Sequence, residues 1–203
     1  MNFNEVCRAA GMPVRARLAL AALLLAVTGA ATAAPISVSI VGPAAPVAAG
    51  STFTLDLRVA GLGPQVPLSG YDFSLRFDDA LVSWQSTTFS TALGASPADY
   101  ADGPSTTPFV AAGGRYLNFV AVSGLFDDEL LARQPDAGFS LLTLVFRAGS
   151  VAGDANFGFA LLGPNGAVTP GFLGAFGETG PDVLEASLGT ARVSIAAPVA
   201  VPE

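Results

Sequence analysis

The segment from residue 70 to residue 84 constrains the fold most strongly. In its sequence, GYDFSLRFDDALVSW, every second residue of the first half is large and apolar: Tyr71, Phe73, Leu75 and Phe77. This period of two over eight residues is typical of a β-strand with one buried face. The acidic pair Asp78-Asp79 then interrupts the pattern, and a second apolar stretch ends at Trp84. The segment therefore predicts a strand, an acidic corner and a return strand at one edge of a β-sandwich.

Alternation of apolar and polar residues recurs along the rest of the chain. It is clearest in segment 52–59, TFTLDLRV, and returns in segments 36–40 and 188–195, while segment 139–147 is apolar enough for a central strand. Many of the 23 Gly and 15 Pro residues lie between these segments, which suits short strands joined by tight turns. About eight or nine such strands predict an all-β fold of the β-sandwich type.

Three segments depart from this pattern. Segment 127–133, DDELLAR, begins with acidic residues and ends with Arg133, which suits the helix dipole, so we expect one short helix. Segment 87–114 contains three prolines and little alternation. It predicts long loops, with at most one short strand near Phe89, that form either a functional surface or a flap. Segment 163–180 is rich in Gly and is also expected to be a loop.

Residues 1–33 have the organisation of a secretory signal peptide. Arg15 and Arg17 precede an apolar run, LALAALLLAV, and small residues follow it. A positive region, an apolar run of about ten residues and a small-residue cleavage site define such peptides, and a run this short is a poor membrane span. We expect cleavage before Ala34 and export to the cell envelope or the extracellular space.

The charge of the exported part excludes several classes of partner. Without residues 1–33 the chain retains six Arg and fifteen acidic residues, a formal net charge of −9. Such a chain repels phosphate backbones, so nucleic-acid binding is not expected. Charge also disfavours docking onto an anionic membrane surface.

The residue types that are absent limit the chemistry. The chain has no His and no Lys, and its one cysteine, Cys7, lies in the predicted leader. Serine–histidine and cysteine–histidine catalysis, the usual zinc sites and the lysine-dependent P-loop are therefore excluded. The exported part also has no disulfide, so its core alone must hold the fold.

Carboxylates and aromatic residues remain as candidate site residues. Acidic residues cluster at Asp78/Asp79, Asp99/Asp102 and Asp127/Asp128/Glu129. Two carboxylates that face each other across a cleft are the catalytic pair of glycosidases. Acidic residues of irregular loops can bind calcium, and the candidate calcium ligands here are Asp78, Asp79, Asp127 and Asp128. The simpler interpretation is solvated turns and a helix N-terminus, with no cofactor.

Exposed aromatic residues could form a surface on which sugars stack. We expect Tyr71 and Trp84 to pack in or near the core, because their positions alternate toward it. Tyr100 lies in the expected loop and is the strongest candidate for an exposed ligand contact; Tyr116 is another. One Trp in the whole chain does not indicate a flat aromatic platform.

With these segments placed, residues 36–195 resemble a cohesin domain. The resemblance is carried by GSTFTLDLRV, by the GYDFSLRFDDALVSW segment and by DDELLARQPDAGFSLLTLVFRA, a short helix that leads into a central strand. It implies a jelly-roll β-sandwich related to certain carbohydrate-binding modules. It also implies a non-enzymatic domain at residues 34–195 that binds a protein of the dockerin type on one sandwich face.

The C-terminus carries a second resemblance. Val201-Pro202-Glu203 follows a Pro/Ala linker and resembles the start of a PEP-CTERM sorting tail, which continues into a membrane helix and an Arg cluster. Residues 196–203 are therefore expected to be a linker to such a tail.

Together these observations predict a secreted or envelope-displayed module without enzymatic activity. Its expected ligand is a protein partner or an extracellular polysaccharide. The alternatives are a structural protein of the envelope or biofilm matrix with no discrete ligand, and, less favoured, a glycan hydrolase.

Overall fold

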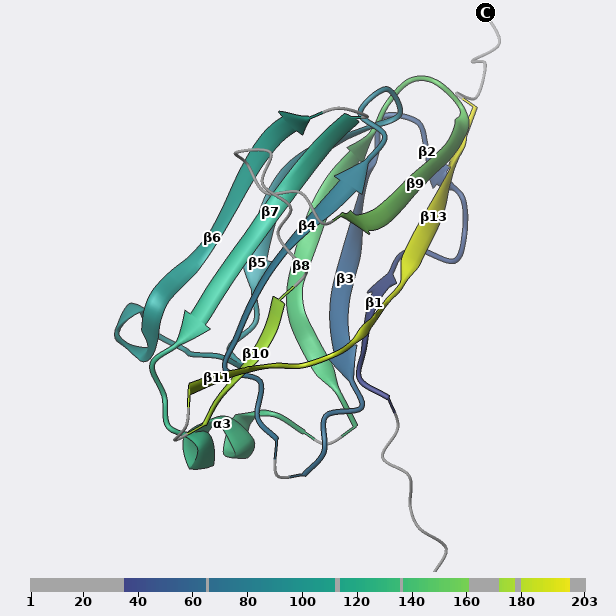
Figure 1. Cartoon of the computed structure of the whole chain (residues 1–203). Helices are drawn as coiled ribbons and strands as arrows, with labels where there is room; N and C mark the ends of the chain where they lie inside the picture. The colour runs from purple at the N-terminus through teal and green to yellow at the C-terminus, as the bar shows by residue number, and fades with distance from the viewer. Residues whose placement is uncertain are drawn as a thin grey trace, which may run out of the picture. The chain divides into compact units, whose positions relative to one another are not determined.

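The computed structural model describes six parts of the chain: residues 35–64, 66–111, 114–135, 137–160, 172–177 and 180–197. For residues 172–177 and 180–183 it describes only the backbone. The predicted signal peptide and the Val201-Pro202-Glu203 motif lie outside the described residues. The domain itself, which carries every predicted strand, can be followed in Figure 1.

Two β-sheets face each other as the two layers of a sandwich (Figure 1). The first sheet has the order β12 (Ser187–Leu188), β1 (Ser37–Val41), β3 (Thr52–Ala60), β8 (Phe139–Ala148), β5 (Val82–Phe89). The second contains β6 (Tyr100–Ala111), β7 (Gly114–Ser123), β4 (Gly70–Phe77), β9 (Gly153–Ala160), β13 (Thr190–Ala196) and β2 (Val47–Ala48), with β10 (Phe172–Gly177) and β11 (Gly180–Val183) continuing beside β4.

Strand β4 is the branching point of the second sheet. It pairs with β7 along one edge over its whole length, and on its other edge with β10 at its start and β9 at its end. Its four apolar residues are all buried: Tyr71, Phe73, Leu75 and Phe77. The predicted corner is confirmed, since Asp78 accepts the Ala80 N–H through Oδ1 at 3.1 Å and turns the chain into β5.

The chain passes from one sheet to the other at the edge of the sandwich. Strand β12 pairs in parallel with β1 in the first sheet, and β13, one residue later, pairs with β9 in the second. Gly189 makes this crossing, and its N–H donates to the Val38 carbonyl at 2.8 Å. Such sharing of edge strands is how a jelly roll limits exposed sheet edges.

The core between the sheets is rich in aromatic side chains. Phe146 of β8 packs against Phe53 of its own sheet and against Phe77 and Phe157 of the facing sheet, with ring centroids 5.1–5.9 Å apart. A second group surrounds Phe73 on β4: Tyr71, Phe119 and Phe159. Val193 and Ile195 of β13 are buried in this core as well, and Ala191 of the same strand is partly buried.

The predicted helix is confirmed as α3 (Asp127–Arg133). The Phe126 N–H donates to Glu129 Oε2 at 3.1 Å across its first turn. Within the described part of the chain, no helix is long and apolar enough to cross a membrane.

Two loop predictions were wrong. Residues 87–114 contain the end of β5, a short 3₁₀ helix η1 (Pro97–Asp99) and the twelve-residue strand β6. Much of segment 163–180 that the structure describes is strand β10, which pairs with both β4 and β11. The described strands therefore number thirteen, more than predicted, and two of them have only two residues.

Candidate functional site

A row of residues in register crosses five strands on the outer face of the second sheet. Phe109 of β6 pairs with Tyr116 of β7, which pairs with Arg76 of β4; Arg76 pairs with Gly158 of β9, and Gly158 with Thr190 of β13. Residues directly opposite in antiparallel strands project from the same face, and here that face is the one opposite the core. The row places Arg76 between an aromatic ring and a residue with no side chain.

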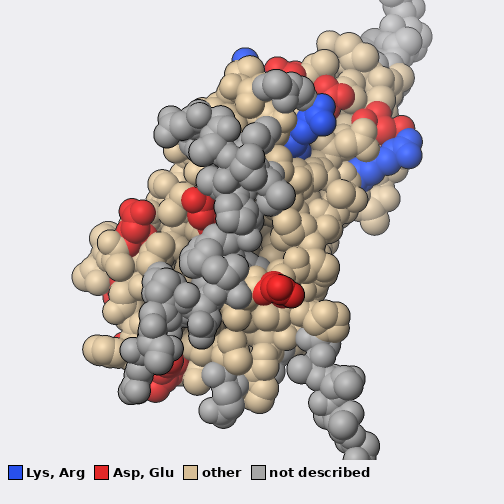
Figure 2. Space-filling view, viewed as in Figure 1, with Lys and Arg blue, Asp and Glu red and all other residues tan. Residues whose placement is uncertain are grey.

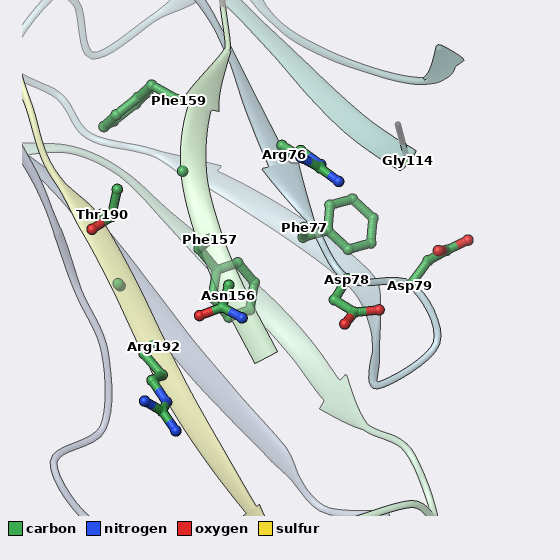
Figure 3. A pocket seen from close by; sticks show the side chains of 12 residues that line it. Arg76, Phe77, Asp78, Asp79, Gly114, Asn156, Phe157, Phe159, Thr190 and Arg192 are labelled. Carbon is green, nitrogen blue, oxygen red and sulfur yellow. The ribbon is translucent and has the colours of Figure 1, made fainter. Parts of the chain in front are cut away.

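A hollow of about 870 Å³ lies beside Arg76, where the neighbouring residues Gly114 and Gly158 have no side chain to fill it. Gly158 lies directly beside Arg76, and a Cβ there would meet only Thr190 Cγ2, at 3.6 Å. Gly114 has φ +142°, and a Cβ on it would lie 3.4 Å from Arg76 Nε. Figure 3 shows Arg76 on one side of the hollow and Thr190, Asn156 and Arg192 on the other.

Within the part of the chain that the structure describes, Arg76 differs from the other five arginines in that its side chain has no partner. Four of them form ion pairs: Arg58 with Asp56 at 3.5 Å, Arg115 with Asp79 at 3.0 Å, Arg133 with Asp99 at 3.7 Å, and Arg192 with Asp154. Arg147 donates through Nε to the Gly50 carbonyl at 3.1 Å. Among the described residues, exposed Arg76 has neither an ion pair nor a hydrogen bond through its side chain.

The rim of the hollow carries an ordered ion pair. Arg192 Nη2 donates to Asp154 Oδ2, and Ser194 donates to Asp154 Oδ1 at 2.6 Å. The hydrogen bond from Arg192 is the main reason that the pKa of Asp154 is lowered, and the same bond raises the pKa of Arg192. Both side chains therefore stay charged and paired, and Arg192 is less available than Arg76 to an external anion.

The middle of this outer face is closed. Ser74 and Asn118, the next pair in the β4–β7 register, are buried, and Tyr116 is only 3% exposed. Asn118 Nδ2 donates to Asp72 Oδ1 at 2.8 Å and lies 3.3 Å from Ser74 Oγ. The accessible part of the face therefore lies where β4 ends. In Figure 2, the visible Arg side chains lie together with acidic side chains at this end of the domain, whereas the remaining described surface of the view shows acidic side chains and no Arg.

The predicted calcium ligands are not brought together. Asp78 and Asp79 follow the end of β4, whereas Asp127 and Asp128 begin α3, which lies at the other end of that strand. Within the described ranges, no three Asp, Glu, His or Cys side chains form a group that could hold a metal ion. A calcium site stays a prediction that no contact of these residues supports.

The sequence predicts that Tyr100 lies in a loop, and this prediction is wrong. Tyr100 begins strand β6, is partly buried, and donates its hydroxyl to the Gly94 carbonyl at 2.9 Å. Burial raises its pKa. Its role as a ligand contact stays a prediction, but its hydroxyl already has a partner within the domain.

The other aromatic candidates are accounted for by packing. Tyr71 is buried in the core as expected, with a pKa raised by desolvation. Tyr116 stacks on Phe109, with centroids 5.1 Å apart and an interplanar angle of 16°. Trp84 is partly buried in a second hollow of about 450 Å³ between β5 and β6, and its Nε1 donates to Thr87 Oγ1 at 3.2 Å.

Asp99 connects the chain before β6 to the helix, and its pKa is lowered. Asp99 Oδ2 accepts the Ala95 N–H at 2.7 Å, Oδ1 accepts the Ser96 hydroxyl at 3.0 Å, and Arg133 lies 3.7 Å away. The backbone hydrogen bond from Ala95 is the largest cause of the lowered pKa.

The Asp99→Asn variant should lose part of the acid sensitivity of the fold. A carboxylate whose pKa is lower in the folded state stabilises the fold above its unfolded pKa of about 3.9, and this contribution disappears as pH falls through the folded value. We expect the free energy of unfolding, measured by urea denaturation between about pH 5 and pH 2, to fall less steeply in Asp99→Asn than in the wild type. Asp102→Asn, an exposed control, should keep the wild-type slope; equal slopes in all three proteins would contradict the assignment.

Comparison with known proteins identifies the fold. No protein-family model matches this sequence, and no curated protein matches it significantly. Among solved structures, the seventh ScaB type I cohesin of Pseudobacteroides cellulosolvens matches with a TM-score of 0.57 and 12% identity, covering 83% of this chain and 97% of that one. A type II cohesin of Acetivibrio cellulolyticus matches with a TM-score of 0.54 and 14% identity, covering 80% and 95%.

The chain has a cohesin-like fold. A third match is the cohesin of the Coh-OlpC–Doc435 cohesin–dockerin complex of Clostridium thermocellum, with a TM-score of 0.51 and 12% identity over 82% of this chain and 99% of that one. These matches span nearly the whole of each cohesin domain. At such identities the similarity is one of backbone architecture, and it does not identify a ligand of this cohesin-like domain.

Proposed function

We propose that this chain is an exported, non-enzymatic module that binds a protein partner of the dockerin type. The binding surface is the accessible end of the outer face of the second sheet, around Arg76. The observation that carries the proposal is the hollow in which this one unpaired arginine lies. Cohesins of the same fold bind dockerins in the Clostridium thermocellum complexes.

The lack of catalytic groups supports a binding role. The exported part has no His, Lys or Cys. Of the two acids that line the hollow, Asp79 is paired with Arg115 and Asp78 caps its own turn. The signal-peptide pattern of residues 1–33 supports export, and Val201-Pro202-Glu203 supports a sorting tail that would hold the module at the envelope.

Site-specific cross-linking tests where the partner binds. A photoreactive residue is placed at Thr190 on the proposed face, and as a control at Thr54, an exposed position on the first sheet. Proteins from the culture supernatant that cross-link are identified and purified, and their affinity is measured by calorimetry. We expect cross-linking from position 190 and not from position 54.

Charge reversal at Arg76 should weaken binding of the identified partner about tenfold or more, as is usual for a central interface residue. The matched control is Arg58→Glu, because Arg58 is an exposed arginine of the opposite sheet. We expect Arg58→Glu to bind within about twofold of the wild type. A partner that cross-links only from position 54, or a polysaccharide that is retained when no protein is, would overturn the proposal.

A further inference from the structure

We infer that the hollow beside Arg76 receives a single carboxylate side chain, an Asp or Glu of the protein partner. The inference rests on the proposed function, because it names what the partner presents to that face. Three features of the described residues lead to it: the free charge of Arg76, the shape of the space beside it, and the net charge of the domain around it.

The free charge is unusual in a domain with a large excess of acids. Fifteen acidic residues compete for six arginines in the exported part, and four of the described arginines are bound to Asp. Among the described residues, the carboxylates nearest to Arg76 in the chain form no ion pair with it: Asp79 binds Arg115 Nε at 3.0 Å, and Asp78 Oδ1 accepts the Ala80 N–H. The five N–H donors of the guanidinium are therefore available to a ligand.

The shape of the hollow suits a carboxylate beside the guanidinium. Gly158, directly opposite Arg76 in the β4–β9 register, leaves the space empty, and Gly114 leaves room for Nε on the other side. Asn156 and Thr190 line the far side with exposed neutral groups, an amide and a hydroxyl (Figure 3). One hydrogen-bond donor of the Asn156 amide is engaged, since Nδ2 donates to the Asp154 carbonyl at 3.3 Å. A planar guanidinium binds a carboxylate through two parallel N–H···O bonds, a geometry that Lys cannot offer.

The charge of the whole domain selects one carboxylate and disfavours a polyanion. The exported part has a formal net charge of −9, so a ligand with many negative charges is repelled. At physiological ionic strength charges interact over only about 8 Å, so a lone carboxylate in a neutral or basic segment experiences mainly the charges that line the hollow. These are the unpaired Arg76, Arg192 paired with Asp154, Asp79 paired with Arg115, and Asp78. This favours an acidic side chain of a protein over a polyuronic acid.

Nuclear magnetic resonance of the arginine Nε–H groups tests the inference without the partner. The ¹⁵N-labelled full-length protein is titrated with capped Gly-Glu-Gly, capped Gly-Gln-Gly and trigalacturonate. The Arg76 signal is assigned by its loss in Arg76→Lys, and the Arg58 signal serves as the internal control. We expect saturable shifts of the Arg76 signal with the Glu peptide, at least fivefold smaller shifts with the Gln peptide, and none for Arg58.

A variant that fills the hollow keeps the charge and removes the space. Gly158→Val adds a β-branched side chain where a Cβ meets only an ordinary contact, so the strand should form as before. Its affinity for the Glu peptide should fall at least fivefold. Equal shifts with both peptides, an unchanged affinity of Gly158→Val, or tighter binding of trigalacturonate than of the Glu peptide would each overturn the inference.

Failure of this inference can be told apart from failure of the proposed function. If Arg76→Gln binds the identified partner as well as the wild type while cross-linking from position 190 persists, the face is right and carboxylate recognition is wrong. If the cross-links come from position 54, the proposed face itself is wrong.

Discussion

Replacement of Phe146 by alanine is expected to lower the free energy of unfolding by about 3–5 kcal/mol. Phe146 is fully buried, and its ring contacts Phe53 of the same sheet at 5.9 Å and Phe77 and Phe157 of the facing sheet at 5.3 and 5.1 Å. Its removal leaves a cavity bounded by both layers, which two hydrogen-bonded sheets cannot close by moving one side chain. Residues 34–203 contain no cysteine, so no disulfide compensates for the loss.

Guanidinium denaturation, followed by the fluorescence of Trp84 and by circular dichroism, measures this loss. The matched control is Phe126→Ala, because Phe126 is 79% exposed and its ring can leave without opening a cavity. We expect that control to stay within about 0.5 kcal/mol of the wild type. A Phe146→Ala protein as stable as Phe126→Ala would mean that the two sheets do not pack through this ring.

The parts of the fold that were predicted correctly are those in which burial on one face leaves a mark on the sequence. Strand β4 shows it in Tyr71, Phe73, Leu75 and Phe77, all of which are buried. The acidic corner and the helix Asp127–Arg133 were also found, since turn chemistry and helix-end charges are local signals.

Strand β6 was missed because neither of its faces is strongly buried. Among the described strands it pairs only with β7; Pro108, which lies opposite the buried Leu117, is exposed, and so is Val110, the next residue on the same face. Pro104 and Pro108 are tolerated because the strand lies at the sheet edge, where Pro hinders addition of a further strand. Alternation is absent where there is no buried side to produce it.

The candidate site was missed for a different reason. In the sequence Arg76 is one of several polar residues in an alternating strand, and nothing local distinguishes it from Arg58. The open space beside Arg76 depends on Gly114 and Gly158, which strand pairing brings next to it from other parts of the chain. Aromatic and acidic residues attracted attention instead, and the structure shows most of them occupied by internal contacts, such as that of Tyr100 with Gly94.

Replacement of Gln134 by leucine is expected to lower the free energy of unfolding by about 2–4 kcal/mol. Gln134 follows α3 and is 7% exposed. Its Oε1 accepts the Leu68 N–H at 2.7 Å, and its Nε2 lies 2.6 Å from the Leu68 carbonyl and 3.2 Å from that of Ala92. Leucine would leave three buried backbone groups without partners, each costing about 1–3 kcal/mol, and its own burial offsets part of that cost.

Two companion variants separate the lost hydrogen bonds from lost packing. Gln134→Glu keeps the acceptor for the Leu68 N–H but places an oxygen against two carbonyl oxygens, so this variant should also be destabilised. Gln85→Leu, at an exposed position on β5, is the control and should stay within about 0.5 kcal/mol of the wild type. Hydrogen exchange of the Leu68 amide should accelerate in Gln134→Leu more than in Gln134→Glu, because only the first removes its acceptor. If that amide exchanged at the wild-type rate in both, Gln134 would not be what anchors the chain entering β4 to α3. The ends of β4 would then be set by the corner at Asp78 and by strand pairing alone.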